Sequence, residues 1–221
     1  MTPQQLKDKI SRAFARYLGV TSNQGTQLIP SGVAGKVYEA YVLSLVARDL
    51  VTKEGCQLRL NRGSRVQLKS SVGPINRAYP HIQVSRGGMP LGEMWTDVAF
   101  LSLSFWRNPQ SATPTKGDVH ELDILLTVPG AAAHPTPKEI LMGIECKHTA
   151  YERRLLREIL GVRRELSLLS GATPTAFKRW PRPTVPADPP SCLLVYSSSP
   201  AITSYAAPGV FFGINFLHEP V

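Results

Sequence analysis

The sequence has few cysteines, no long apolar run and a shortage of acidic residues, and each shortage excludes a class of protein. Three cysteines in 221 residues are an odd number without metal-site spacing, so we expect a reducing compartment and no disulfide framework. No run approaches the roughly 18 apolar residues that a membrane-spanning helix needs. The segment from Met1 to Tyr17 lacks the apolar core of a signal peptide. We therefore expect a cytoplasmic protein without membrane contact.

The acidic residues are outnumbered by basic ones. The chain has 25 Lys and Arg against 16 Asp and Glu, a formal net charge of +9. Such an excess suits a polyanionic partner, and nucleic acid is favoured over a membrane surface. An apolar fraction of 43% in a chain of this length is enough for one domain with a buried core.

Apolar residues at helical spacing predict three helices. They run from Thr2 to Leu18, from Gly32 to Leu50 and from Tyr151 to Leu169. Ser31 is the expected cap of the second helix, which carries Glu39 in the middle of a mostly apolar stretch. The polar face of the third helix carries Arg153, Arg154, Arg157, Arg163 and Arg164.

Runs rich in β-branched and aromatic residues predict the strands. They are Gln57–Leu60, Arg65–Leu68, Asp97–Phe105, Glu121–Val128, Glu139–Lys147, Ser191–Ser197 and Gly209–Phe216. The order of helices and strands favours a mixed central β-sheet flanked by helices in a single α/β domain spanning 1–221. Residues 1–30 would be an N-terminal helix and loop, and residues 31–217 the core.

Two predicted strands carry charged residues among apolar ones. Alternate residues of a strand share a face, so Glu145 and Lys147 point the same way and Cys146 points into the opposite layer. If the two strands pair as a hairpin, Asp123 stands beside Glu145. Two carboxylates and one ammonium then converge at the sheet edge. Burying these charges is costly unless they pair with one another or bind a cation.

This arrangement suits a metal ion. The carboxylates of Asp123 and Glu145 and the backbone carbonyl of Cys146 make an oxygen site suited to Mg²⁺ or Mn²⁺. Such an ion activates its bound water and offsets charge on a phosphodiester under attack. Lys147 would orient the nucleophile and stabilise the transition state. Glu39 could reach the same ion directly or through water.

Asp123 followed by Glu145-Cys146-Lys147, with an acidic residue on a preceding helix, resembles the PD-(D/E)XK nuclease superfamily, also called restriction-endonuclease-like. The resemblance implies that Asp123 and Glu145 are metal ligands, Lys147 the catalytic lysine and Glu39 the helical acidic residue. The helices and strands predicted for the stretch 32–216 follow the order of elements in the core of that superfamily. The chain departs from the family pattern at Leu122, where the family name has Pro. It also has extra strands between the helix and Asp123.

By this resemblance the protein is expected to be a Mg²⁺-dependent endonuclease that hydrolyses DNA, most naturally double-stranded, in prokaryotic defence or restriction. A homo-oligomer or a regulatory protein partner would supply control. The basic helix offers phosphate contacts, which position a ligand without reading its sequence. Residues predicted to contact nucleic acid are Arg153, Arg154, Arg157, His120 and His148.

Other interpretations remain open from the sequence. The charged residues could form a structural ion-pair cluster, and the histidines could be local hydrogen-bonding groups. Asp97, which also opens an apolar strand, competes with Asp123. Glu152, Glu158 and Glu165 are spaced to pair with arginines of their own helix. A non-catalytic nucleic-acid-binding or assembly subunit on the same fold, or a repair or recombination nuclease, are alternative functions. The segment 32–36 lacks P-loop spacing, so no nucleotide site is predicted there.

Overall fold

A computed structural model describes residues 2–20, 34–169, 176–177, 179–180 and 187–221. In this part of the chain, seven strands form one sheet whose spatial order follows the sequence. Neighbouring strands from β1 to β5 are antiparallel, whereas β5, β6 and β7 are parallel. The protein is therefore α/β with a mixed sheet, as the sequence predicts. The strands are β1 Cys56–Asn61, β2 His81–Arg86, β3 Met89–Leu101, β4 Val119–Thr127, β5 Ile140–Lys147, β6 Cys192–Ser197 and β7 Ile214–His218.

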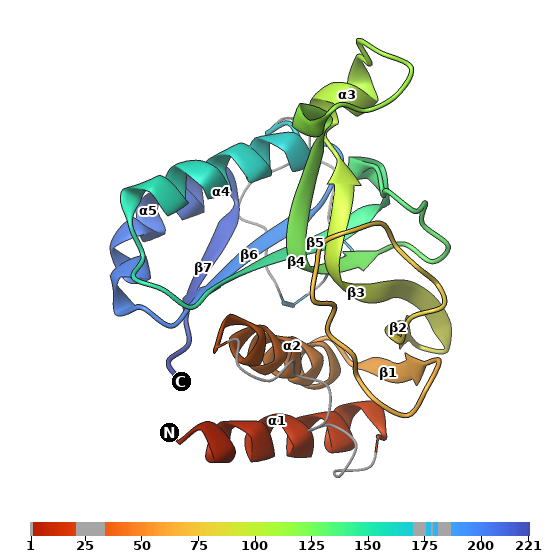
Figure 1. The fold of residues 1–221 in the computed structure, drawn as a ribbon, viewed down its shortest axis with the longest axis vertical. Coiled ribbons are helices and arrows are strands. Elements are labelled where there is room, and N and C mark those ends of the chain that lie inside the picture. The colour runs from red at the N-terminus through yellow and green to blue at the C-terminus, as the bar shows by residue number, and fades with distance from the viewer. Residues whose placement is uncertain (1, 21–33, 170–175, 178, 181–186) are drawn as a thin grey trace.

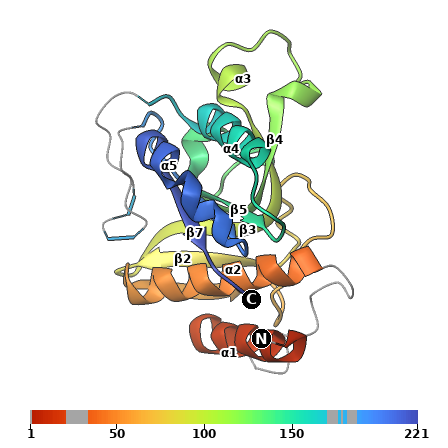
Figure 2. The same ribbon diagram turned by 90° about the vertical axis from the view of Figure 1, so that its left-hand side faces the viewer.

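Helices cover both faces of the sheet (Figures 1 and 2). On one face α2 packs on the sheet and α1 packs on α2, and an apolar core fills the space between them. On the other face a second core lies under α4 and the segment that contains α5. None of the described helices is long and apolar enough to cross a membrane. The helices are α1 Pro3–Leu18, α2 Ala34–Thr52, α3 Leu103–Arg107, α4 Arg153–Leu166 and α5 Ala206–Phe212.

The first helix begins and ends where the sequence predicts. The Thr2 side chain accepts a hydrogen bond from the backbone N–H of Gln5, and Gly19 adopts the left-handed conformation that ends many helices. The second helix matches its predicted range from Ala34 onward. Its predicted cap Ser31 and first residue Gly32 lie outside the described residues.

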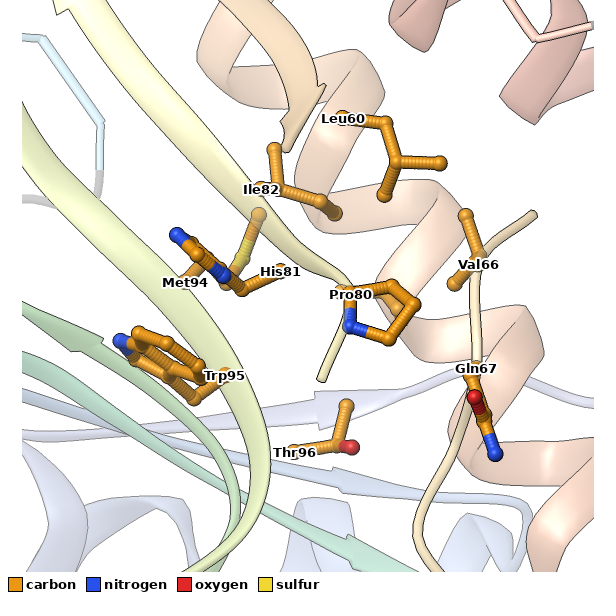
Figure 3. Close-up of a pocket in the computed structure, with 10 residues that line it drawn as sticks. Leu60, Val66, Gln67, Pro80, His81, Ile82, Met94, Trp95 and Thr96 are labelled. Carbon is orange, nitrogen blue, oxygen red and sulfur yellow. The ribbon is translucent and has the colours of Figure 1, made fainter. Parts of the chain in front are cut away.

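The predicted strand Arg65–Leu68 is wrong. These residues form an irregular segment, and the side chains of Val66 and Leu68 are buried in the core. Their alternation therefore reflects burial of a loop against the sheet, without a strand ladder. A small cavity between Val66 and β2 and β3, drawn in Figure 3, has a volume of about 20 Å³. That is room for about one water molecule, so it is a packing gap and not a ligand pocket.

Two further predicted strands are corrected at one end. The run Asp97–Phe105 stops being a strand at Leu101, because the Ser102 side chain accepts from the N–H of Phe105 and begins α3. The run Gly209–Phe216 is half helix and half strand. Its first part belongs to α5, which ends at Gly213 in the left-handed conformation, and β7 follows.

The sequence predicts Arg163 on the polar face of α4, but in the structure this residue is buried. Only 2% of the residue is exposed. Its guanidinium donates to the carbonyls of Phe212 and Ser191 and to the Ser191 hydroxyl. Burial lowers the pKa of Arg163 to about 10. The residue therefore ties α4 to the segments that flank β6 and α5, and it is not available to a ligand.

Candidate functional site

The strands β4 and β5 separate at the point where the charged residues begin. Their antiparallel pairing reaches Ile124 opposite Ile144, and Asp123 and Glu145 are the next residues along each strand. The hairpin inferred from the sequence is therefore present. However, β4 and β5 are central strands of the sheet. The charged residues thus lie where two inner strands part, and the expectation of a site at the sheet edge is corrected.

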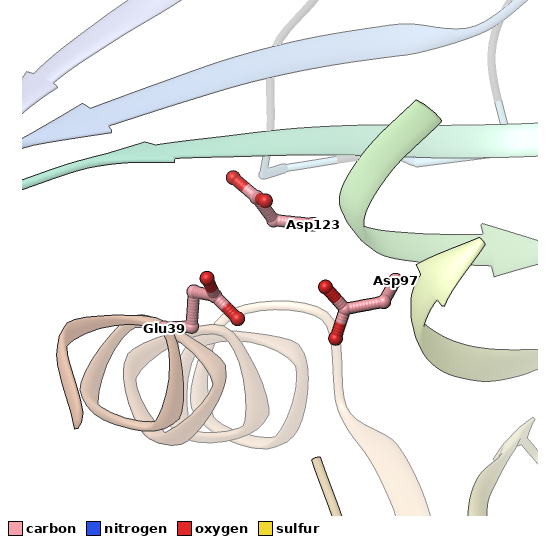
Figure 4. A group of neighbouring side chains, drawn as sticks. All are labelled: Glu39, Asp97 and Asp123. Carbon is pink, nitrogen blue, oxygen red and sulfur yellow. The ribbon is translucent and has the colours of Figure 1, made fainter. Parts of the chain in front are cut away.

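An acidic cluster forms at this separation from three elements. Its members are Glu39 of α2, Asp97 of β3 and Asp123 of β4, and one carboxylate oxygen of each lies within 4.8 Å of the others. Figure 4 shows the three side chains pointing toward one another. Glu39 is 8% exposed and Asp97 3% exposed. We refer to these three residues as the acidic cluster.

Lys36, which lies on α2 with Glu39, neutralises part of the acidic cluster. The ammonium of Lys36 lies 2.7 Å from Oε2 of Glu39 and 2.5 Å from Oδ1 of Asp97. The second oxygen of Asp97, Oδ2, is buried and has no hydrogen-bond partner within the described residues. A buried carboxylate oxygen without a donor is costly, so it marks a position where a cation or a water molecule would be favourable.

A pocket of about 300 Å³ opens beside the acidic cluster and shares Asp123 with it. Glu145 and Lys147 line it from β5, Glu158 from α4, and His120 from β4. The Lys147 ammonium bridges two carboxylates, at 2.9 Å from Oε2 of Glu145 and 3.0 Å from Oε1 of Glu158. Glu145 and Lys147 therefore share one strand face, as predicted. We call this the Lys147 pocket.

Burial dominates the electrostatics of the carboxylates. It raises the pKa of Asp123, against the opposing effects of the Cys146 N–H and of the Lys147 charge. It also raises the pKa of Glu145, and the neighbouring charge of Asp123 raises it further. Burial raises the pKa of Glu39 to about 7 although Lys36 opposes this. These carboxyl groups lie close together in a poorly solvated part of the protein. A bound divalent cation would lower the cost of their negative charge.

The lysines respond in the opposite sense. Burial alone would lower the pKa of Lys147, but the charges and hydrogen bonds of Glu145 and Glu158 outweigh it, and the pKa lies above its usual value. The pKa of Lys36 is likewise raised by Asp97 and Glu39 against the effect of burial. Both ammonium groups therefore stay charged at neutral pH, and neither is suited to be a general base.

Cys146 contributes its backbone to the site. Its N–H donates to Oδ2 of Asp123 at 2.6 Å, which fixes the orientation of that carboxylate. The side chain packs against the core on the α2 face, opposite to Glu145 and Lys147. The sequence expectation concerned the Cys146 carbonyl as a metal ligand, whereas the contact in the structure comes from its amide.

Of the five residues predicted to contact nucleic acid, four lie on α4 or line the Lys147 pocket, and one does neither. Arg153, Arg154 and Arg157 are exposed on α4, the helix that supplies Glu158 to the Lys147 pocket. His120 lines that pocket. The fifth residue, His148, lies elsewhere: its ring stacks on Tyr38 with centroids 5.1 Å apart, and Nδ1 is 2.9 Å from the Ser198 hydroxyl. It is not among the residues that line the Lys147 pocket.

Sequence reasoning undervalued three residues of the site. Asp97 was treated as a competitor of Asp123, but the structure brings both into the acidic cluster. Glu158 was expected to pair within its helix, yet its partner is Lys147. Lys36 received no role, although its spacing of three residues from Glu39 on a helix was a usable signal.

Comparison with known proteins found no relative, so the interpretation of the site rests on its geometry. No family model, no curated protein and no solved structure matches this chain.

Proposed function

We propose that this protein is a Mg²⁺- or Mn²⁺-dependent nuclease of the PD-(D/E)XK type, acting as an endonuclease on DNA. The order α2, β3, β4, β5, α4 and β6, with β1, β2 and α3 as additional elements, supports the proposal because it agrees with the arrangement that the resemblance implies. The observation that carries the proposal is the position of Asp123, which belongs both to the acidic cluster and to the pocket containing Glu145 and Lys147. One carboxylate thus links a candidate metal site to a protonated lysine.

The residues of the acidic cluster fit a hard divalent cation. All of the donor groups are carboxylates, the ligands that Mg²⁺ and Mn²⁺ prefer. Adjacent ligands of an octahedral Mg²⁺ lie about 3 Å apart. The three oxygens lie within 4.8 Å of one another, so the carboxylates would draw closer together around a bound ion. Oδ2 of Asp97, which has no hydrogen-bond partner among the described residues, supplies a further ligand atom. Glu39, Asp97 and Asp123 would hold the ion, with Glu145 beside it.

When bound, the ion would lower the pKa of a coordinated water and offset negative charge on the phosphate. The protein's own residues supply the rest. Lys147, held charged between Glu145 and Glu158, would donate to the phosphodiester oxygens as their charge increases. The Cys146 N–H keeps Asp123 oriented toward the cluster. Arg153, Arg154 and Arg157 offer exposed positive charge to the phosphate backbone beyond the pocket.

The proposal is tested by incubating purified protein with supercoiled plasmid, duplex DNA, single-stranded DNA and RNA. Each substrate is tested with Mg²⁺, with Mn²⁺ and with EDTA. We expect cleavage of DNA only with a metal, and a loss of at least about a hundredfold in Asp123→Asn and Lys147→Met. Glu158→Gln should reduce the rate less, because it removes only a group that positions Lys147.

Asp8→Asn is the matched control, because Asp8 is a helix residue of α1 whose side chain accepts from Gln4 outside the site. Equal cleavage by Asp123→Asn and Asp8→Asn would mean a contaminating nuclease or a different active site. Duplex binding that persists in EDTA, without cleavage under any metal, would support a non-catalytic nucleic-acid-binding subunit and overturn the proposal.

A further inference from the structure

Lys36 has no role in the nuclease chemistry described above, yet its ammonium group lies inside the acidic cluster. It contacts an oxygen of Glu39 and an oxygen of Asp97, and its side chain is only 14% exposed. Lys36 stands one helical turn before Glu39 on α2, so helix geometry keeps it within reach of the cluster. The acidic cluster therefore has a cation built into the chain.

That cation and a divalent metal ion would compete for the same oxygen atoms. Mg²⁺ binds carboxylate oxygens at about 2.0–2.1 Å and tolerates little departure from octahedral geometry. The ammonium already lies between Glu39 Oε2 and Asp97 Oδ1. A metal ion at those oxygens would be in direct contact with a like charge in a poorly solvated setting, which is strongly unfavourable. The long flexible stem of lysine lets the ammonium leave without movement of the helix.

A second observation shows that Lys36 satisfies the cluster only in part. Asp97 is 3% exposed, its Oδ2 has no partner within the described residues, and its side chain points toward Glu39 and Asp123 (Figure 4). The Lys36 ammonium contacts one oxygen of Glu39 and one of Asp97, whereas Asp123 accepts from the Cys146 N–H. The buried Oδ2 of Asp97, without a donor among the described residues, is where a divalent cation would be favourable.

We propose that Lys36 is an internal competitor of the metal ion, whose ammonium must leave Glu39 and Asp97 before a divalent cation binds there. This inference rests on the proposed function, because it concerns the same metal site. Lys36 thereby weakens metal binding to the resting protein and becomes exposed when the metal binds. The released ammonium is then free to contact an anionic group at the mouth of the site.

The affinity for Mn²⁺ alone tests the competition. Titration calorimetry or the electron paramagnetic resonance of free Mn²⁺ would compare the wild type, Lys36→Met and Lys53→Met. Lys53 is the matched control, because it directly follows α2 and pairs with Asp49 of that helix at 2.9 Å, outside the cluster. We expect Lys36→Met to bind Mn²⁺ about tenfold more tightly or better, the effect of removing one charge-assisted hydrogen-bonding competitor. Lys53→Met should bind like the wild type.

A second measurement needs no variant and remains decisive if Lys36→Met does not fold. The wild type is acylated with an amine-reactive reagent, with and without Mn²⁺, and lysine labelling is quantified by mass spectrometry. We expect labelling of Lys36 to rise several-fold with Mn²⁺, while that of the exposed Lys53 stays constant.

The outcomes separate the two proposals. Mn²⁺ binding with equal affinity in wild type and Lys36→Met, together with unchanged protection of Lys36, overturns the competition and leaves the nuclease proposal standing. Absence of Mn²⁺ binding in both folded proteins overturns the metal site and the competition together. Binding by Lys36→Met but not by the wild type is the strongest form of the expected result.

Discussion

Asp97 is directed into the site by its own backbone. Its φ angle is 50°, in the left-handed region that few non-glycine residues occupy, although Asp tolerates it better than most. The pairing of β3 with β4 passes from Thr96–Ile124 to Val98–Leu122 without a change of register, and it leaves Asp97 and Asp123, which lie opposite each other, out of the ladder. This irregularity turns the side chain out of strand alternation and toward Glu39. Strain of this kind persists where the surrounding structure maintains it, and functional sites are a common place for it.

Glu39 makes the stability of the protein depend on pH. Burial raises its pKa to about 7 from an ordinary value of 4.5, against the opposing effect of Lys36. Between these values the folded protein keeps a proton that the unfolded chain loses, so the free energy of unfolding falls as pH rises through this range. We expect Glu39→Gln to show a flatter pH dependence than the wild type in EDTA, measured by urea unfolding at several pH values.

A divalent cation should reverse this dependence, because carboxylates bind metal in the deprotonated form. With Mg²⁺ present, wild-type stability should therefore gain more at about pH 8 than at about pH 5.5. Asp123 and Glu145 also have raised pKa values and act in the same direction, so Glu39→Gln keeps part of the effect. Parallel pH curves for the two proteins in EDTA would contradict the assignment to Glu39.

Among the helices and strands, the predictable ones are those whose own sequence shows a clear apolar run or a helical periodicity. The apolar runs of β4, β5 and β6 and the amphipathic α1 and α4 are recognised from sequence for this reason. The strand β2 and the first half of β3 were not. They meet at a two-glycine turn, and the first residues of β3 include Pro90 and Gly92, residues of low strand propensity that tertiary packing overrides.

The candidate site was predictable to the same extent. Glu145 and Lys147 follow from strand alternation, and Asp123 from the hairpin. The convergence of Asp97 and Lys36 on Glu39 could not be predicted, because it depends on a strand irregularity and on the packing of α2 across the sheet. Periodicity carries no information on either.

Gly92 tests how tightly β3 and β4 pack against each other, and Gly161 in α4 serves as its control. A methyl group on Gly92 would approach the backbone carbonyl oxygen of Thr127 to 2.3 Å, so one of the two strands would have to move. Gly161 lies exposed within α4, and nothing lies within 4 Å of an added methyl group there. We expect Gly92→Ala to destabilise the protein by about 1–3 kcal/mol or more and Gly161→Ala to stabilise it by about 0.5–1 kcal/mol. Urea unfolding of both variants measures this, and equal effects would mean that β3 and β4 pack more loosely than the structure indicates.

At the scale of the whole molecule, the net charge of +9 is spread over surfaces that face in different directions. The helices α1 and α4 lie on opposite sides of the sheet, with α2 between α1 and the strands (Figures 1 and 2). Both carry exposed basic residues, but only α4 also supplies a residue to the Lys147 pocket. If nucleic acid binds at this pocket, the charge of α4 matters for binding and that of α1 does not.

The salt dependence of duplex binding distinguishes these two surfaces. Each phosphate neutralised by a basic side chain adds about 0.9 to the slope of log affinity against log salt, through counterion release. Replacing Arg153, Arg154 and Arg157 by Gln should therefore lower the magnitude of this slope by about two to three. Fluorescence anisotropy of a labelled duplex in EDTA, over a series of KCl concentrations, measures the slope without cleavage.

The matched variant removes the same number of charges from α1, by replacing Lys7, Arg12 and Arg16 with Gln. Its slope should equal that of the wild type, because these side chains belong to the helix on the far side of α2. If both triple variants reduce the slope equally, the duplex responds to net charge alone. The α4 surface would then have no special place beside the pocket, and the phosphate path would have to be sought on another face. A reduction confined to the α4 variant would place the nucleic acid along the helix that holds Glu158 against Lys147.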